Sequence, residues 1–191
     1  MCRVFIVLVS LMISACSTVP SQINYYLLDS AINDVGHHQK LTTAKKITLQ
    51  KLQLAKYLQS ASLPLLQQDH GVIYANQHVW AEPLQLSIQR VLVNDFNQLS
   101  SHQLFLDNMP NAVNSDYQLQ IQIDHFSATN NSEVVLIGTY WLSNHKIASN
   151  GQPFFFKQQL DVDGFSYAIG QQRLLITELV KMIASDVEKY S

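Results

Sequence analysis

The residues Gly164-Phe165-Ser166-Tyr167-Ala168 come closest to a catalytic motif in this chain. They lie between a predicted strand and a predicted helix and nearly match the G-x-S-x-G nucleophile elbow, in which a sharp turn exposes a reactive serine hydroxyl. In hydrolases with that motif the histidine base follows the serine along the chain, whereas the last histidine here, His145, precedes Ser166. We therefore predict no catalytic residue and no enzyme, and we interpret Ser166 as a helix cap whose hydroxyl satisfies a free backbone N–H.

The seven histidines do not show the spacing of a metal site. His37 and His38 are adjacent in a predicted loop, and His70 and His78 flank one predicted hairpin. None follows the H-E-x-x-H pattern, which places two histidines and a glutamate together on a zinc-binding helix. We expect surface histidines, no metal and no cofactor.

Cys16 is the candidate for covalent modification. The chain begins Met1-Cys2-Arg3, continues through ten residues from Val4 to Ile13 with one polar member, and then reaches Ser14-Ala15-Cys16. A bilayer-spanning helix needs about 20 apolar residues, so a charged start, a short apolar run and small residues indicate a secretory signal. The pattern resembles a bacterial lipobox. That resemblance implies cleavage before Cys16 and an N-acyl, S-diacylglycerol lipid on this residue; a plain signal peptide or a short membrane helix are the alternatives.

Removal of residues 1–15 changes the composition little. The mature chain keeps 176 of 191 residues, and the loss of Arg3 leaves 11 basic against 14 acidic residues, a formal charge of −3. Nucleic-acid binding requires clustered excess Lys and Arg, so we exclude it. Cys2 leaves with the signal and Cys16 carries lipid, so no disulfide or cysteine metal site is available. A chain of this length and apolar content predicts a single domain.

The residue after the anchor, Ser17, bears on sorting. In bacterial lipoproteins, aspartate at this position retains the protein at the inner membrane, so serine implies the periplasmic face of the outer membrane. About 8 residues separate Ser17 from the first strand-like residue, Tyr25, and span at most about 28 Å. We therefore predict a signal peptide over residues 1–15, a lipidated tether over 16–24 and one domain over 25–191.

The first half of the domain predicts short strands. Residues Asn24–Asp29 have the aromatic and apolar composition of a strand, and residues 30–45 indicate a loop. The pattern Ile47, Leu49, Leu52 and Leu54 is ambiguous between strand and helix. We favour a strand from Ile47 that breaks near Lys51, followed by a strand end at Tyr57-Leu58. Pro64–Gln68 and Val72–Asn76 predict a hairpin, with Gly71 supplying the positive φ of its turn.

The second half alternates helix and strand periods. Leu84 to Leu99 has helical spacing after Pro83, which the first turn tolerates. Tyr117–Asp124 alternates apolar and polar residues, a turn at Asn130-Asn131 leads to a strand over Glu133–Leu142, and Asn150-Gly151 predicts a hairpin into Pro153–Lys157.

The chain ends in a predicted helix from about Ser166 to Lys189, with Ala168, Leu175, Leu179, Met182 and Ile183 on its buried side. These elements predict an α/β (α+β) sandwich, in which two long helices pack on one face of a largely antiparallel sheet.

Several motifs together resemble the PqiC/YmbA family of ABC-type transport auxiliary lipoproteins. They are the lipobox, Tyr25-Tyr26-Leu27-Leu28, Tyr57-Leu58, and Trp80-Ala81-Glu82-Pro83-Leu84 at the first long helix. The resemblance spans nearly the whole mature chain. One departure is Ala55-Lys56, where the family often has a proline, so the register before Tyr57 is open.

The resemblance implies a role in transport rather than a reaction. Members accompany periplasmic MCE-domain proteins, and their inner-membrane partners, in systems that carry lipid between the two membranes. The chain would be the outer-membrane docking subunit, present as a homo-oligomer and held to the membrane by its lipid. The alternative is a lipoprotein that assembles an outer-membrane component such as the lipopolysaccharide translocon.

Tyr57, Trp80 and Glu82 are the candidate interface residues. Aromatic residues are enriched at protein interfaces, but Trp80 and Glu82 also suit a core position and a helix start, where an acidic residue is stabilised by the macrodipole. Five lysines between Lys40 and Lys56 suggest a solvated face, with contact to lipid headgroups as the alternative.

Overall fold

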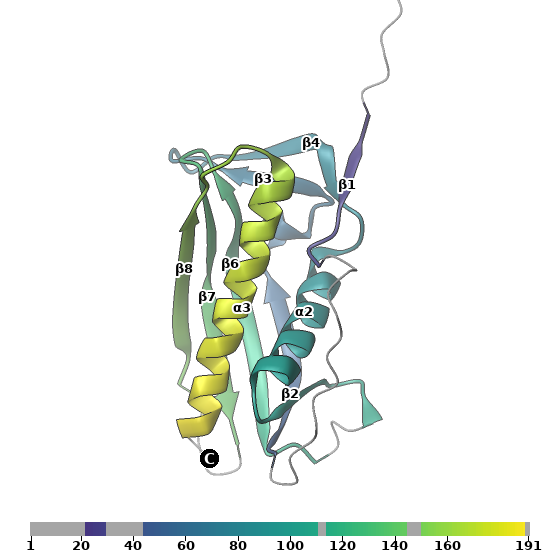
Figure 1. Ribbon diagram of the computed structural model, residues 1–191, viewed down its shortest axis with the longest axis vertical. Coiled ribbons are helices and arrows are strands. Elements are labelled where there is room, and N and C mark those ends of the chain that lie inside the picture. The colour runs from purple at the N-terminus through teal and green to yellow at the C-terminus, as the bar shows by residue number, and fades with distance from the viewer. Residues whose placement is uncertain (1–21, 30–43, 111–113, 145–149, 190–191) are drawn as a thin grey trace, which may run out of the picture.

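An eight-stranded sheet and two helices form the two layers of the domain (Figure 1). The computed structural model describes residues 22–29, 44–110, 114–144 and 150–189. Helices α2 (Leu84–Leu99) and α3 (Phe165–Lys189) both pack on the same face of the sheet. The predicted α+β sandwich is therefore confirmed.

The sheet is mixed rather than largely antiparallel. Its strands are β1 (Asn24–Tyr26), β2 (Lys46–Leu54), β3 (Ser62–Leu66), β4 (Val72–Trp80), β5 (Gln103–Leu106), β6 (Tyr117–Thr129), β7 (Glu133–Ser143) and β8 (Gln152–Gln159). The β3–β4, β6–β7 and β7–β8 pairs are antiparallel, whereas β1–β4, β2–β5, β2–β6 and β3–β6 are parallel. Hairpins explain the antiparallel pairs, because adjacent strands joined by short turns must run in opposite directions. The parallel pairs join strands distant in sequence, which local patterns do not reveal.

The central strand β6 organises the sheet. Strand β7 pairs along one edge of β6, while β2 and β3 share the other edge, β2 over Tyr117–Ile123 and β3 over Ala128-Thr129. Between them the chain forms the short 3₁₀ helix η2 (Lys56–Gln59). The sequence placed Tyr57-Leu58 in a strand, which is wrong. The predicted break near Lys51 is a bulge instead, since the β2–β6 register shifts between Leu49 and Lys51 and the strand continues to Leu54.

The β3–β4 hairpin is confirmed, but its turn differs from the prediction. The residue with positive φ is His70, at 66°, and not Gly71. Asp69 provides the reason, because its carboxylate accepts a hydrogen bond from the Gly71 N–H at 3.2 Å and closes the turn locally.

Strands β6, β7 and β8 form the predicted meander, and the turn at Asn130-Asn131 is confirmed. Asn150-Gly151 is not a two-residue hairpin turn, since β7 ends at Ser143 and β8 begins at Gln152. Gly138 of β7 lies opposite the register shift in β6, where a side chain would stand 2.1 Å from the Gln122 carbonyl oxygen and 2.6 Å from the Phe154 ring.

The two helices match their predicted extents closely. Pro83 immediately precedes α2 at its N-cap position, without a side-chain cap. Helix α3 begins at Phe165, so Ser166 lies within its first turn and is not the N-cap as expected. The Gly164 carbonyl instead accepts the first helical hydrogen bond, from the Ala168 N–H.

The core lies between the helices and the sheet face that they cover. Its fully buried members include Ile88, Leu92 and Phe96 of α2, Ile176 and Leu179 of α3, and Ile47, Leu119, Ile121, Ile123 and Leu136 of the sheet. On the opposite face of the sheet, glutamines predominate in β6, and Gln120 donates to the Gln50 side chain of β2. The predicted wet face of β6 is therefore confirmed.

Candidate functional site

A groove of about 460 Å³ lies beside the start of α2 and brings two of the three candidate interface residues together. Its walls come from the end of β2, from η2 and the residues that connect it to β3, and from the β4–α2 connection. They include the apolar side chains of Leu54, Leu58, Trp80 and Leu84 and the polar side chains of Gln59, Glu82 and Gln85. An apolar floor with a few convergent polar groups is typical of a binding groove.

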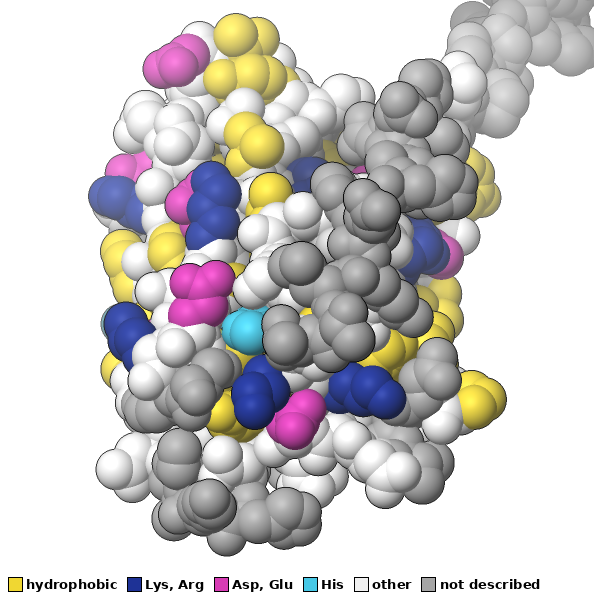
Figure 2. Space-filling view, turned by 60° about the horizontal axis from the view of Figure 1, so that its bottom comes forward, with side chains coloured by type: hydrophobic (Ala, Val, Ile, Leu, Met, Phe, Trp, Pro, Cys, Tyr) yellow, Lys and Arg dark blue, Asp and Glu magenta, His cyan; other side chains and the backbone are white. Residues whose placement is uncertain are grey.

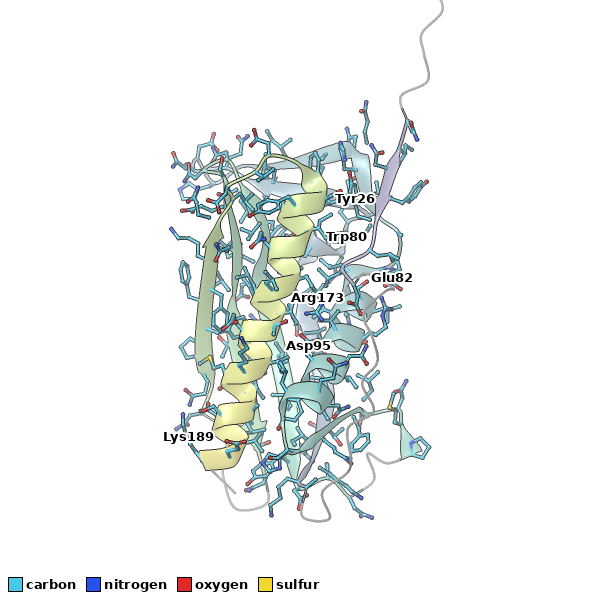
Figure 3. The ribbon with its side chains drawn as sticks, in the orientation of Figure 1. Tyr26, Trp80, Glu82, Asp95, Arg173 and Lys189 are labelled. Carbon is cyan, nitrogen blue, oxygen red and sulfur yellow. The ribbon has the colours of Figure 1, made fainter. Side chains whose placement is uncertain are left out.

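Trp80 is part of the core as well as of the groove wall. It is the last residue of β4 and is 6% exposed. Its indole Nε1 is buried and finds no hydrogen-bond acceptor among the described residues. A buried indole N–H normally has a partner, so the groove wall contains one unused donor. Figure 3 shows Trp80 near Glu82 and Tyr26, at the end of the molecule opposite Lys189.

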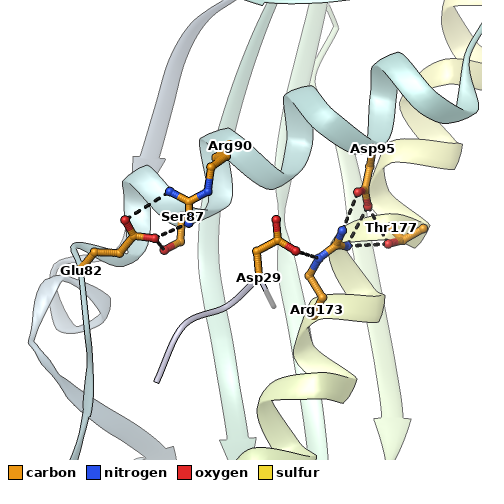
Figure 4. A network of polar contacts seen from close by, with 7 residues as sticks. All are labelled: Asp29, Glu82, Ser87, Arg90, Asp95, Arg173 and Thr177. Carbon is orange, nitrogen blue, oxygen red and sulfur yellow. Dashed lines mark hydrogen bonds and ion pairs between the residues drawn. The ribbon is translucent and has the colours of Figure 1, made fainter. Parts of the chain in front are cut away.

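Glu82 lies at the groove beside the first turns of α2 and is held by two residues of that helix (Figure 4). Its carboxylate accepts a hydrogen bond from Ser87 Oγ at 2.5 Å and pairs with both terminal nitrogens of Arg90. These hydrogen bonds, that from Arg90 foremost, hold the pKa of Glu82 below its ordinary value. The carboxylate is thus charged and oriented at the groove.

The Tyr57 side chain points away from the groove, toward β6. Its hydroxyl is 3.0 Å from Nδ1 of His125 on β6, and its backbone carbonyl accepts a hydrogen bond from the Tyr74 hydroxyl. Burial raises the pKa of Tyr57 to about 12, against hydrogen bonds to the Phe126 backbone and to Ser127 that lower it. Tyr57 therefore joins η2 to β6. The Tyr57 side chain is not among those lining the groove.

A buried ion-pair network links α2 and α3, and the sequence analysis missed it. Arg173 binds Asp95 in two parallel hydrogen bonds of 2.7 and 2.5 Å, Thr177 donates to the same carboxylate at 2.7 Å, and Asp29 lies 3.5 Å from Arg173 Nε (Figure 4). Burial lowers the pKa of Arg173, but the hydrogen bonds and charges of Asp95 and Asp29 outweigh it and raise that pKa. A signal was present in the sequence: Asp95 falls on the apolar side of the α2 helix, between Leu92 and Phe96.

An aromatic stack connects β1, β4 and the start of α3. The His78 ring lies 3.8 Å from that of Phe165 and 5.7 Å from that of Tyr26, and the Tyr26 hydroxyl is 2.8 Å from His78 Nδ1. His78 is thus a structural residue rather than a free surface histidine as expected. His37 and His38 lie outside the described residues.

No cluster of three metal-binding side chains occurs within the ranges that the structure describes. Ser166 sits in the first turn of α3, and its neighbours Tyr167 and Phe165 supply no base. Lys46, Lys51 and Lys56 are exposed and Lys45 is partly buried, while Lys40 lies outside the described residues. On the face shown in Figure 2, basic and acidic side chains are interspersed, without a single-sign patch.

Cys16 and Ser17 lie outside the described residues, as does residue range 1–21 as a whole. In the described part of the chain, no helix has the combined length and apolar character that a membrane crossing needs.

The chain matches a known class of lipoproteins. The model of the ABC-type transport auxiliary lipoprotein component family matches residues 26–184. Because the match covers most of the chain, the protein belongs to this family.

Two solved structures show the same fold. One, a crystal structure of a protein described as uncharacterized, has a TM-score of 0.70 and 18% identity and covers 87% of this chain and 99% of that chain. The other, XCC0632 from Xanthomonas campestris, of the family DUF330, has a TM-score of 0.66 and 14% identity and covers 88% and 99%. No curated protein matches the chain at a significant level.

Proposed function

We propose that this transport auxiliary lipoprotein is the outer-membrane subunit of an MCE-type system that moves lipid between membranes. It docks the outer end of a periplasmic conduit, whose other end is held by an inner-membrane partner. The observation that carries the proposal is the family match over residues 26–184 together with the lipobox cysteine ahead of it.

The anchor and the tether support a docking role at the membrane surface. A lipidated Cys16 would bury many methylenes at about 0.8 kcal/mol each, which makes attachment effectively permanent without a spanning helix. Ser17 favours export to the outer membrane. The tether to Tyr25 then keeps the domain within about 28 Å of its bilayer.

The groove at Trp80 and Glu82 is the proposed contact for the periplasmic partner. Its apolar floor suits a hydrophobic side chain, and the oriented Glu82 carboxylate suits a basic or amide group beside it. The Tyr57 side chain, turned toward His125, lies outside this contact. Several copies of the domain would meet a hollow conduit as a closed ring, the usual symmetry of identical subunits.

The membrane and the partner are tested together by purification of the native protein from envelopes. We expect the MCE-domain protein to be recovered with wild type from outer membranes, and the Cys16→Ser protein to leave the membrane while its domain stays folded. The Ser17→Asp protein is expected at the inner membrane, folded but inactive, because the tether cannot reach the far bilayer. Full complementation by inner-membrane Ser17→Asp protein, or recovery of lipopolysaccharide-translocon components in place of an MCE protein, would refute the proposal.

The groove is tested by filling it from its rim. Ala81 is exposed and lines the groove, so Ala81→Trp should occlude it without disturbing the core. Leu86→Trp, at an exposed position of α2 outside the groove lining, is the matched control. We expect loss of partner recovery for Ala81→Trp alone, with unchanged thermal unfolding of both. Equal recovery of the partner by the two variants would assign the contact to another surface.

A further inference from the structure

Residues 23–28, which contain β1 (Asn24–Tyr26), carry apolar side chains on both sides with Asn24 as the one polar member, although only one side meets the core. Tyr26 and Leu28 point inward, and Leu28 is buried. Ile23, Tyr25 and Leu27 alternate with them and point outward, with 48%, 68% and 48% of their surfaces exposed. Strand alternation normally places polar residues on an exposed face, so the outward row of β1, defined as Ile23, Tyr25 and Leu27, requires a separate explanation.

The outward row continues across the sheet without charge. Tyr25 pairs with Val79 of β4, and Val79 pairs with Ser62 of β3, so these side chains share a face. Along the chain, none of the thirteen residues from Cys16 to Leu28 is charged. A partner that covers this row is therefore not recruited by ion pairs.

The row also lies within a short stretch of chain from the lipidation site. Ile23 follows Cys16 by seven residues, a span of at most about 25 Å even at full extension. Figure 1 shows β1 at the end of the molecule opposite the C-terminus of α3. Tyrosine flanked by aliphatic residues is a composition typical of the boundary between acyl chains and headgroups.

We propose that the outward row of β1 lies in the surface of the bilayer that holds the lipid anchor. This inference rests on the proposed function, because it takes Cys16 as acylated. Ile23 and Leu27 contact the acyl boundary, and the Tyr25 hydroxyl lies among the headgroups. The anchor then does more than tether the domain, because the contact also fixes the orientation of the domain, and of the adjacent groove, relative to the membrane.

Single thiols report on the row directly, because the mature chain has no free cysteine once Cys16 is acylated. Tyr25→Cys and Leu27→Cys are labelled with an environment-sensitive fluorophore on the purified lipoprotein in phosphatidylcholine vesicles. Leu99→Cys, at the C-terminal end of α2 and similarly exposed, is the matched control. We expect blue-shifted emission and a severalfold loss of iodide quenching for the two β1 labels, unchanged by added salt, and full quenching for the control.

The outcomes separate this inference from the function on which it rests. If the mass shows the lipid on Cys16 and iodide quenches the β1 labels as strongly as the Leu99 control, the membrane contact alone is overturned. The same labels can also be placed on Cys16→Ser protein without vesicles. If they are still protected from iodide and the native mass exceeds one chain, a second copy covers the row, and the membrane contact is overturned. A mass without lipid on Cys16 would overturn the anchor and the contact together.

Discussion

Removal of the Asp95 carboxylate is expected to weaken the contact between α2 and α3 more than any change on the surface of either helix. In the Asp95→Ala protein, Arg173 would lose two short hydrogen bonds and its main countercharge. Asp95 and Arg173 have side chains only 8% and 19% exposed, so water replaces little of what is lost. Asp29, at 3.5 Å, remains as a weaker partner.

The size of the effect follows from this burial. Loss of one partner of a buried ion pair costs about 3–5 kcal/mol, and the residual contact to Asp29 places Asp95→Ala near the lower end. For a domain of this size, about 3 kcal/mol lowers Tm by about 6–12 °C. Replacing both partners, as Asp95→Leu with Arg173→Met, should recover most of that loss, because the buried guanidinium is removed together with its main countercharge and only the weaker contact to Asp29 is lost.

The assay is thermal and urea unfolding, followed by circular dichroism, of Cys16→Ser protein carrying each change. The matched control is Glu82→Gln, which weakens the more exposed pair with Arg90 on the same helix and should cost less than about 1 kcal/mol. The reasoning would be refuted if Asp95→Ala unfolded at the same temperature and urea concentration as the control. A double variant less stable than Asp95→Ala would also refute the reasoning, because the unpaired Arg173 charge would then not be the cause of the lost stability.

Three further variants test the packing and the titration. Gly138→Ala should destabilise the sheet by several kcal/mol, because the new methyl group would stand 2.1 Å from a backbone oxygen. Gly170→Ala, with open space around it in α3, should stabilise the protein by about 0.5–1 kcal/mol. Equal melting temperatures of the two variants would contradict the close approach in β7. Since the pKa of Tyr57 is raised to about 12 in the folded state, unfolding should become easier as pH rises from about 10 to 12, where only the unfolded chain loses this proton. Absorbance at alkaline pH should show one fewer late-titrating tyrosine in Tyr57→Phe than in wild type, and the alkaline loss of stability should be smaller; an unchanged late titration would contradict the raised pKa of Tyr57.

The elements with a clear period could be predicted from the sequence. The α2 and α3 helices, the β3–β4 hairpin and the β6–β7–β8 meander depend on contacts within or between neighbouring segments, which spacing and turn residues encode. The parallel pairs of β6 with β2 and β3 depend on contacts between distant segments. Strand β5 was missed for the same reason, since its four residues are ordered by pairing with β2.

The candidate site was predicted in part. Trp80 and Glu82 do meet at one groove, because they flank the connection from β4 to α2 and so remain close in space. Tyr57 was grouped with them as an interface aromatic, but η2 turns its side chain toward His125. The Asp95–Arg173 pair joins two helices far apart in the chain, so only its unexpected polarity within the α2 pattern pointed to it.

The shared edge of β6 has a mechanical consequence. Strands β1, β4 and β3 form a unit whose ladder with β6 consists of two residue pairs, Leu65 with Ala128 and Leu66 with Thr129. Under the proposed function, the lipid tether enters this unit through β1. Tension on the tether would then reach β6 through that short ladder, and the helices through the β4–α2 connection and the aromatic stack on α3.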